Sequence, residues 1–332
     1  MVKLSVMITS YELAPYIREA LESVLMQETD FPVEILVGDD GSSDGTLEIL
    51  EEYEKQGKIR LFPAQQSREE GSDRVSRAAA NRLRLLKEAK GEYCCFLDGD
   101  DWYTDKTRLQ RMTEILDKPE NADCVMCATN LWMSWPDGHK QALSRAKKER
   151  KISFKQYWPT MFLQSDALLF RNISPEHPPK GSLAEQFDDN EITFWLFRHG
   201  KMYYLPECSV SYRQLPGSSW DGMSEAKRCA VNLIGFGVEC ESDPSCRKEA
   251  LARCYPSLRE LTETKESWDK EELEPWYGLA EEKGWSEVLL AFRCKDSGRE
   301  EERKLKNLLS EARREYLKGR AGRIMRKLTG RY

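Results

Sequence analysis

Three carboxylates stand within four positions in the stretch CCFLDGDDWY, which covers residues 94–103. The apolar run has the composition of a buried strand, and Asp98, Asp100 and Asp101 come directly at its end. Like charges at this spacing repel one another, and the repulsion is costly unless a cation or a set of hydrogen-bond donors compensates it. This acid cluster therefore predicts that something positive is bound at the end of the strand.

Two further groups of polar side chains come at the ends of strand-like runs. Thr9 and Tyr11 end or follow the run KLSVMIT, and Asp39 and Asp40 end the run VEILVGDD. Each group also has a purely structural interpretation, because Asp40 can cap the next helix and Tyr11 can pack at the edge of a sheet. Acidic clusters at strand ends are costly without a ligand, so we expect the three groups to form one binding site.

The first hundred residues alternate between strand-like and helix-like patterns. Strands are predicted at residues 3–9, 33–40, 58–64 and 92–101, and helices at residues 15–27, 46–56 and 77–91. This alternating order predicts an α/β fold with a parallel, doubly wound sheet. Ligands bind such sheets beyond the carboxyl ends of the strands, which is where the three polar groups fall.

Composition narrows the class of protein. The chain has 332 residues, is 40% hydrophobic and carries a formal net charge of −6, which argues against binding of nucleic acid along a basic surface. It has no apolar run of the roughly 18 residues that a membrane span needs. Its ten cysteines, in a long chain without a secretion signal, are expected to be reduced thiols. We therefore expect a cytoplasmic globular protein.

Two motifs have the spacing of metal ligands, but the sequence around each of them does not suit a metal site. CVMC at residues 124–127 lies in a strand-like run without a second cysteine pair at zinc spacing. Residues 40–51 match the calcium-loop pattern, but a calcium hand needs a helix before the loop, and here a short run rich in Val and Ile precedes it. Neither motif is expected to bind a metal.

Four motifs together resemble those of the family 2 glycosyltransferases, which have the GT-A fold. They are VMITSYE, ILVGDDGSSDGT, AKGEYCCFLDGDDWY and FDDNEITFWLFRHGKMYYLPECSVSYR, in the family's order and spacing, within residues 3–220. The resemblance implies a GT-A type doubly wound mixed sheet flanked by helices. It places the transferase domain at residues 1–221, with a nucleotide-sugar-binding half (1–101) and an acceptor half (102–221).

The resemblance also implies the chemistry: an inverting transferase with a nucleotide-sugar donor, usually a uridine diphosphate sugar, and a divalent metal, Mn²⁺ or Mg²⁺, at a D-x-D motif. That motif is Asp98-Gly99-Asp100 here. Asp98 would lie near the ribose and the metal, Asp100 would ligate the metal, and Asp101 would support the metal site. The cation would offset the charge of the acid cluster and neutralise the donor's diphosphate.

The same resemblance assigns the donor's nucleoside to the strand ends. Thr9, Tyr11 and Asp40 match the positions that hold the uracil and its ribose. Two departures affect this assignment: Glu12 stands where many relatives have Asn, and AAN at residues 79–81 replaces the usual Ala-Arg-Asn. A donor-contacting arginine must then come from Arg68, Arg74 or Arg77, of which we favour the last two. The expected donor contacts are Thr9, Tyr11, Glu12, Asp39, Asp40, Arg74, Arg77, Asp98 and Gly99.

Transfer needs a general base for the acceptor hydroxyl, on the face opposite the leaving group. The family uses the second acid of an ED pair, which aligns with FDDNE here, so Asp189 is the candidate base and Asp188 its neighbour. Both acids also suit the N-terminus of a helix, where carboxylates favour the dipole. Gln164, Ser165 and Asp166 lie in a stretch that resembles the acceptor-side strand, and we expect them to touch the acceptor.

Residues 211–220 resemble the segment that closes over the donor, with Gly217 as a pivot; an ordinary surface loop is the alternative. Residues 222–332 are charged and helix-periodic, which predicts a helical C-terminal appendage. Residues 313–332 carry eight Lys or Arg and one acid, and we expect them to hold the protein against the inner face of an anionic membrane. A frayed helix, or a helix docked on the protein, is the alternative, because Gly319 and two other glycines weaken a helix.

The function expected from these observations is transfer of a sugar to a hydroxyl of a glycan or lipid-linked acceptor in the synthesis of a cell-surface polysaccharide. A sugar-nucleotide pyrophosphorylase would share the fold class and the metal, but it needs a Gly-rich loop with Arg and Lys after the first strand, where this chain has TSYELAPY. A non-catalytic sugar-binding or scaffold protein on the same fold is the second alternative.

Overall fold

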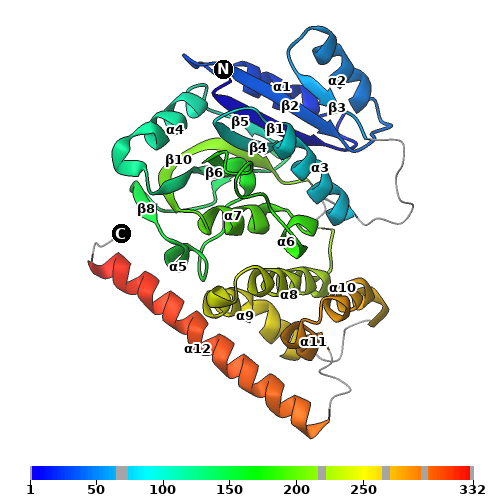
Figure 1. Ribbon diagram of the computed structural model, residues 1–332, viewed down its shortest axis with the longest axis vertical. Helices are drawn as coiled ribbons and strands as arrows, with labels where there is room; N and C mark the ends of the chain where they lie inside the picture. Colours follow the sequence, from blue (N-terminus) through cyan, green and yellow to red (C-terminus); the bar gives the residue numbers. More distant parts are fainter. Residues whose placement is uncertain (1, 65–73, 216–221, 264–269, 293–297, 330–332) are drawn as a thin grey trace. The chain divides into compact units, whose positions relative to one another are not determined.

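The structure is a computed structural model, and it describes residues 2–64, 74–215, 222–263, 270–292 and 298–329 (Figure 1). The side chains of residues 74–76, 263, 270 and 324–329 lie outside the described part. The chain divides into two compact units. The first unit consists of Met1–Ser153 and Leu163–Gln214, and the second unit of Phe154–Phe162 and Leu215–Tyr332.

The first unit contains a ten-stranded sheet with the order β3-β2-β1-β4-β9-β6-β10-β5, to which β7 adds beside β6 and β8 beside β10. The strands are β1 (Leu4–Ser10), β2 (Val33–Asp39), β3 (Arg60–Phe62), β4 (Tyr93–Asp98), β5 (Trp102–Tyr103), β6 (Cys124–Ser134), β7 (Lys140–Ala142), β8 (Arg150–Ile152), β9 (Leu168–Arg171) and β10 (Lys201–Arg213). Strands β3, β2, β1 and β4 are parallel, and β9 runs antiparallel to β4 and β6. The parallel order predicted from the residues holds for the N-terminal strands, and the whole sheet is mixed, as the resemblance implies.

Apolar side chains on both faces explain why the central strands read as continuous apolar runs. Leu4, Val6, Met7 and Ile8 of β1 are all fully buried. Parallel strands covered by helices on both faces bury both sets of alternating side chains, whereas a half-exposed strand alternates apolar with polar residues. The inner strands therefore form the core, and their polar ends mark its rim.

Helices cover this sheet. They are α1 (Ile17–Leu25), α2 (Thr46–Lys55), α3 (Arg74–Glu88), α4 (Arg108–Asp117), α6 (Ser182–Glu185) and α7 (Asp189–Phe197), with short 3₁₀ turns η1 (Pro119–Asn121) and η2 (Ser165–Ala167). Helix α1 buries Ile17, Ala20, Leu21 and Val24, an apolar stripe at helical spacing. Helix α3 packs on β1 and β2, and α4 packs on β6. Helix α3 begins three residues before the predicted helix and carries the arginines considered for donor binding.

The strand register brings the predicted polar groups together. Thr9 pairs with Asp98 in the β1–β4 ladder, and Ser10 pairs with Asp39 in the β1–β2 ladder. Because the three strands are parallel, their carboxyl ends meet at one edge of the sheet. The predicted rim of polar side chains is therefore present.

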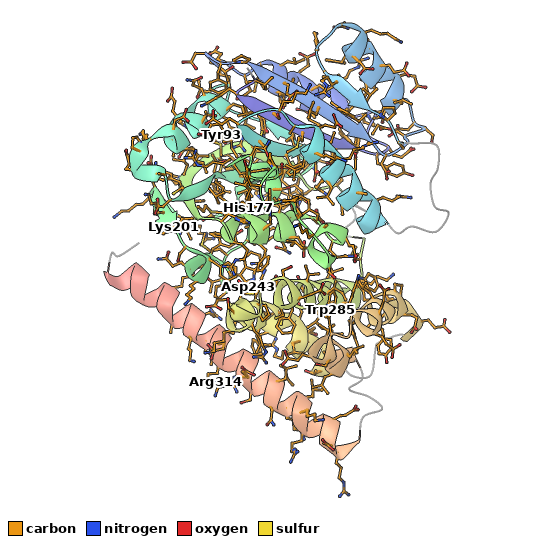
Figure 2. All side chains as sticks on the ribbon, in the orientation of Figure 1. Tyr93, His177, Lys201, Asp243, Trp285 and Arg314 are labelled. Atoms are coloured by element: carbon orange, nitrogen blue, oxygen red, sulfur yellow. The ribbon has the colours of Figure 1, made fainter. Side chains whose placement is uncertain are left out.

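The second unit is helical in its described residues. It contains α5 (Phe154–Tyr157), α8 (Glu225–Ser242), η3 (Pro244–Cys246), α9 (Arg247–Glu263), α10 (Lys270–Glu282), α11 (Ser286–Phe292) and α12 (Arg299–Thr329). Figure 1 shows α12 as one long helix, and Arg314 lies near its middle in Figure 2. The helical C-terminal region predicted for residues 222–332 is present. Across the residues that the structure describes, no helix combines the length and the apolar character needed to cross a membrane.

Candidate active site

The acid cluster begins where β4 ends beside β1. Thr9 Oγ1 donates a hydrogen bond of 2.7 Å to Asp98 Oδ1. The Gly99 N–H donates to the carbonyl oxygen of Thr9 over 2.8 Å. A Cβ at position 99 would lie 2.9 Å from that carbonyl oxygen and 2.9 Å from Cδ1 of Ile17, closer than atoms normally approach. The glycine of the D-x-D motif is thus required by this close approach of two backbones.

Arg82 is a buried cation beside the acid cluster. One Nη atom lies 2.9 Å from Asp98 Oδ1 and the other 3.0 Å from Asp188 Oδ1, and its side chain is 6% exposed. Burial lowers the pKa of Arg82, but the charges of Asp98, Asp188, Asp189 and Asp166 outweigh burial and raise that pKa above its usual value. A side chain of the chain itself therefore supplies part of the positive charge that the acid cluster needs.

The sequence analysis missed Arg82, although α3 carries a signal that could have found it. Ala79, Arg82, Leu85 and Leu86 are all buried and follow helical spacing. An arginine inside an otherwise apolar stripe must find a carboxylate partner, because an unpaired buried charge is costly. The arginines considered for the donor, Arg74 and Arg77, lie instead near the start of the helix.

Two buried carboxyl groups lie next to each other behind Asp98. Asp101 is 1% exposed and Asp166 is 2% exposed. Asp101 Oδ1 accepts a 2.7 Å hydrogen bond from the Arg213 N–H, and Asp166 Oδ1 accepts one of 3.2 Å from the Asp98 N–H. Burial and the charge of Asp166 raise the pKa of Asp101 well above its usual value, and the two side chains share a hydrogen bond. A proton held between them removes one charge from the acid cluster.

Asp189 is the first residue of α7. Its carboxylate accepts a hydrogen bond from the segment that was expected to touch the acceptor. Its Oδ1 accepts a 2.8 Å hydrogen bond from the Ser165 N–H. Burial raises the pKa of Asp189 to about 7; the charge of Asp188 adds to this effect, and Arg82 opposes it. Asp188 is the N-cap residue of α7, but its side chain makes no capping hydrogen bond and instead pairs with Arg82. The dipole interpretation alone therefore does not account for this acid pair.

The three residues expected to touch the acceptor lie mostly beneath the surface. Gln164 is 8% exposed, Ser165 1% and Asp166 2%. Ser165 contributes its backbone N–H to Asp189, and Asp166 pairs with Asp101. Their contact with an acceptor stays a prediction, but the segment clearly positions two acids of the site.

The loop after β2 is organised by the carboxylate of Asp39, which is fully buried. Its Oδ1 accepts from the N–H groups of Gly41 and Ser42, each over 2.8 Å, and its Oδ2 accepts from the Ser42 hydroxyl over 2.6 Å. Asp39 therefore shapes this loop, and its contact with the donor stays a prediction. Glu12 has a left-handed backbone with φ of 56°, and its Oε1 accepts from the Ser43 N–H over 2.8 Å.

Asp40, Arg77 and Tyr11 form a second cluster at this rim. Arg77 Nε lies 3.1 Å from Asp40 Oδ2, and the guanidinium carbon lies 5.4 Å from the centre of the Tyr11 ring. Three side chains proposed for nucleoside binding are thus in mutual contact. The side chain of Arg74 and all of Arg68 lie outside the described residues.

The end of β10 adds two residues that the sequence analysis did not single out. Burial raises the pKa of Tyr212 above its usual value, and the charges of Asp101 and Asp189 add to this, which places its hydroxyl near the acids. Arg213 lies 4.3 Å over the Trp102 ring, and its Nη2 donates to Glu19 Oε2 over 2.6 Å. The predicted closing segment falls partly on residues 216–221, including Gly217, which are outside the described part.

The oxygen atoms at this rim fit a small divalent cation better than a soft metal. Asp98 is 31% exposed at its side chain, and Asp100 is also partly exposed. Carboxylate oxygens are the ligands of Mg²⁺ and Mn²⁺, and Mg²⁺ commonly takes one or two carboxylates with water and substrate phosphates. Among the described residues no three His, Cys, Asp or Glu side chains form a metal cage. A site with one or two carboxylates is therefore the kind these residues can form.

Comparison with known families decides the class of protein. The model of the family "Glycosyl transferase family 2" matches residues 5–176. The chain belongs to glycosyl transferase family 2. This match confirms the resemblance drawn from the four motifs. The mixed sheet of this family 2 chain is that of a GT-A fold.

Relatives of this family 2 chain include two bacterial proteins. Uncharacterized protein Rv1520 of Mycobacterium tuberculosis is 28% identical over 244 residues, which cover 71% of this chain and 65% of that protein. The chain thus spans about two thirds of the length of this relative. Poly(ribitol-phosphate) beta-N-acetylglucosaminyltransferase TarS of Staphylococcus aureus is 36% identical over 121 residues, which cover 36% of this chain and 19% of TarS.

Solved structures agree on the fold. TarS residues 1–349 in complex with UDP-GlcNAc superpose with a TM-score of 0.61 at 19% identity, covering 97% of this chain and 92% of that one. The mannosyltransferase PcManGT of Pyrobaculum calidifontis, in complex with GDP-Man and Mn²⁺, superposes with a TM-score of 0.51 at 15% identity, covering 95% and 87%. At these identities the likeness establishes the fold of the family 2 chain.

Proposed function

We propose that this protein is an inverting, metal-dependent glycosyltransferase that moves a sugar from a uridine diphosphate donor to a hydroxyl of a glycan or lipid-linked acceptor. The observation that carries the proposal is the half-buried carboxylate of Asp189, which accepts the Ser165 N–H and whose pKa is raised to about 7, in the same charge network as Arg82 and Asp98. The complexes of TarS with UDP-GlcNAc and with UDP support a uridine diphosphate donor. The name of TarS supports a role in cell-surface polysaccharide synthesis.

In the proposed reaction Asp189 takes the proton of the acceptor hydroxyl. The acceptor oxygen then forms a bond to the anomeric carbon while the bond from that carbon to the diphosphate oxygen breaks, and the electron pair leaves with the nucleoside diphosphate. Attack on the face opposite the leaving group inverts the anomeric configuration. A base with a pKa near the working pH is suited to this transfer, since it is available as carboxylate and still accepts a proton.

Asp98 and Asp100 would hold the divalent cation, Mn²⁺ or Mg²⁺, and Asp101 would support them from beneath. A bound cation supplies Lewis acidity to the leaving diphosphate. The side chain of Arg82 fixes the orientation of Asp98 and of Asp188 through its two ion pairs. Tyr11 offers a ring face to the uracil, with Asp40 and Arg77 beside it.

The direct test measures release of UDP from a panel of uridine diphosphate sugars, with and without Mn²⁺. We expect release that requires both the sugar donor and the cation. A pyrophosphorylase would instead form a nucleoside triphosphate from the sugar nucleotide and pyrophosphate. A non-catalytic binding protein would be stabilised by the donor without releasing UDP. Either of these outcomes would contradict the proposal.

Replacing Asp100 by alanine should abolish Mn²⁺-dependent donor binding while the fold persists. Removing one charge from a repelling cluster does not weaken the native state through charge repulsion. Isothermal titration with the donor, in Mn²⁺ and in EDTA, measures the effect, and Asp30→Ala serves as control because Asp30 is an exposed acid of the same unit. Mn²⁺-dependent binding of Asp100→Ala at parental strength would remove Asp100 from the metal site.

We propose further that α12 contacts the inner face of an anionic membrane. Arg313, Arg314 and Lys318 line a shallow groove on this helix together with Leu317, whose exposed fraction of 51% is large for an apolar residue. Each basic side chain near an anionic surface contributes roughly 1 kcal/mol. The helical backbone of α12 to Thr329 favours this proposal, because Gly319 and Gly322 lie within the helix and do not end it.

Co-sedimentation with liposomes tests the membrane contact. The variant with Arg313, Arg314 and Lys318 changed to Glu should lose binding to anionic vesicles, and the control with Arg303, Lys304 and Lys306 changed to Glu should keep it. Both variants alter the net charge equally on the same helix, and all six side chains are exposed. Equal loss in both variants, or binding to neutral vesicles as well, would contradict a membrane-facing surface in this part of α12.

A further inference from the structure

Residues 154–162, which we call the strap, belong to the helical second unit although the chain before and after them belongs to the first unit. Within the strap, Trp158 is fully buried. Its indole Nε1 donates a hydrogen bond of 2.8 Å to Glu239 Oε2 of α8. A buried indole N–H needs such a partner, and Glu239, only 4% exposed, is buried to provide it.

Helix α9 holds the strap at two further points. The Arg253 Nη1 donates to the carbonyl oxygen of Trp158 over 3.2 Å and to that of Met161 over 2.9 Å. Its guanidinium carbon also lies 4.4 Å from the centre of the Trp158 ring. One arginine thus fixes both the backbone and the ring of the strap, with charge-assisted hydrogen bonds that are stronger than neutral ones.

Helix α12 also contacts the strap. A Cβ built on Gly319 would lie 2.8 Å from Cβ of Pro159, so only glycine allows this contact. Arg323 Nη1 donates to the Thr160 carbonyl oxygen over 2.9 Å. Helices α8, α9 and α12 therefore all contact the nine-residue strap, and these contacts leave the strap little freedom to move within the second unit.

The strap leads directly into the segment that orients the candidate base. Three residues separate Met161, whose carbonyl is anchored, from Ser165, whose N–H donates to Asp189 Oδ1. Leu163 and Gln164 in this connection are 2% and 8% exposed, whereas Phe162 is 43% exposed, so the part of the connection next to Ser165 is packed. A shift of the strap would be passed along the chain to the Ser165 amide, and a small misplacement of a catalytic group can lower turnover by up to about 10²-fold.

We propose that Glu239, Trp158 and Arg253 are positioning residues for the general base: the helical second unit holds the strap so that the Ser165 amide orients Asp189. This proposal rests on the proposed function, because it presumes that Asp189 is the base. It gives the C-terminal helices a part in catalysis that does not require them to touch the donor or the acceptor. Stability alone does not explain why a glutamate is buried to hold a segment inserted between two parts of another unit.

The test compares variants that release the strap with one that weakens the second unit elsewhere. Glu239→Leu removes the acceptor of the Trp158 indole, and Arg253→Met removes both backbone anchors. Glu239→Gln keeps an acceptor oxygen of the same shape. Arg247→Met is the matched control, because Arg247 on α9 pairs with Glu287 over 2.9 Å and with Glu311 over 2.7 Å, and none of these contacts involves the strap.

Each full-length variant is measured for its melting temperature, its donor affinity, and its rate of UDP release as a function of pH, using the donor that wild type cleaves fastest. We expect Glu239→Leu and Arg253→Met to lower the turnover rate roughly tenfold with unchanged donor affinity. The Ser165 N–H donates to the Asp189 carboxylate and thus favours its charged form, so loss of this bond should also move the acid side of the rate profile to higher pH. Glu239→Gln should behave as wild type, and Arg247→Met should lower the melting temperature alone.

The possible results distinguish a failure of the positioning proposal from a failure of the proposed function. If wild type releases no UDP from any donor, the proposed function is wrong and the inference falls with it. If wild type is active but the two strap variants lose only stability, as the Arg247→Met control does, the strap is a structural element and the positioning proposal is wrong. A loss of turnover in Glu239→Gln equal to that in Glu239→Leu would likewise contradict it, because the hydrogen bond is retained.

Discussion

Replacing Asp189 by asparagine should lower the turnover rate by about 10²-fold or more, which is the scale of general-base catalysis. Asparagine keeps the size of the side chain and can still accept the Ser165 N–H through its amide oxygen, but it cannot take a proton. Donor affinity should stay nearly unchanged, because no contact of Asp189 is proposed with the nucleotide. Initial rates of UDP release and titration of the donor separate the two quantities.

The pH dependence of the wild-type rate also tests the assignment of Asp189 as the general base. Burial raises the pKa of Asp189 to about 7, so half of the base is protonated at that pH. Only the carboxylate accepts a proton, so the rate should rise with pH through about 7 and fall about tenfold for each unit below it. Asp188→Asn removes a neighbouring negative charge and should move this limb to lower pH.

A loss of donor affinity in Asp189→Asn that matches the loss of rate would move this residue to the donor site. A residual rate with the wild-type pH profile would show that another group is the base. Both results would contradict the proposed mechanism, and both are visible in the same set of measurements.

Arg82→Met should weaken the site and the fold together. The change leaves Asp98 and Asp188 without the cation that lies within 3.0 Å of each. Removing one partner of a buried ion pair costs about 3–5 kcal/mol, but Asp188 is 47% exposed and solvent screening reduces the effect, so about 1–3 kcal/mol is expected. Because the charge of Arg82 also lowers the pKa of Asp189, the acid limb of the rate profile should move to higher pH.

Urea unfolding measures the stability of Arg82→Met, and donor titration measures its site. Arg84→Met is a suitable control on the same helix, because Arg84 donates to the backbone carbonyls of Phe62 over 2.6 Å and Pro63 over 2.8 Å rather than to the acid cluster. Unchanged stability and donor affinity in Arg82→Met would mean that Asp98 and Asp188 do not depend on this cation. A shift of the acid limb to lower pH would contradict the electrostatic account.

The strands and the rim were predictable because both depend on local pattern. A strand buried on both faces reads as a continuous apolar run, and parallel strands place their carboxyl ends at one edge, so Thr9 and Asp98 could be put together before any contact was known. The antiparallel β9 was not visible in the alternation of strands and helices. The resemblance to the family implied a mixed sheet, but it did not say which strand is antiparallel.

The contacts that set the charges of the site were not predictable, because they join residues far apart in the sequence. Asp101 and Asp166 are separated by 65 positions, and neither position alone indicates a shared proton. Asp39 stays a predicted donor contact, and the sequence did not indicate that its buried carboxylate also accepts from the N–H groups of its own loop. The glycines near the C-terminus were expected to weaken the helix, whereas Gly319 lets α12 approach Pro159.

The most direct measurement of the central claim is a thermal-shift panel of nucleotide sugars, each with Mn²⁺ and with EDTA. A ligand that binds only the folded protein at 100 times its dissociation constant stabilises it by about 2.7 kcal/mol, which raises the melting temperature by several degrees. We predict that uridine diphosphate sugars raise the melting temperature with Mn²⁺, that EDTA removes most of the shift, and that Asp100→Ala shows none. No shift with any nucleotide sugar in the presence of Mn²⁺ would contradict the account of this protein as a metal-dependent glycosyltransferase.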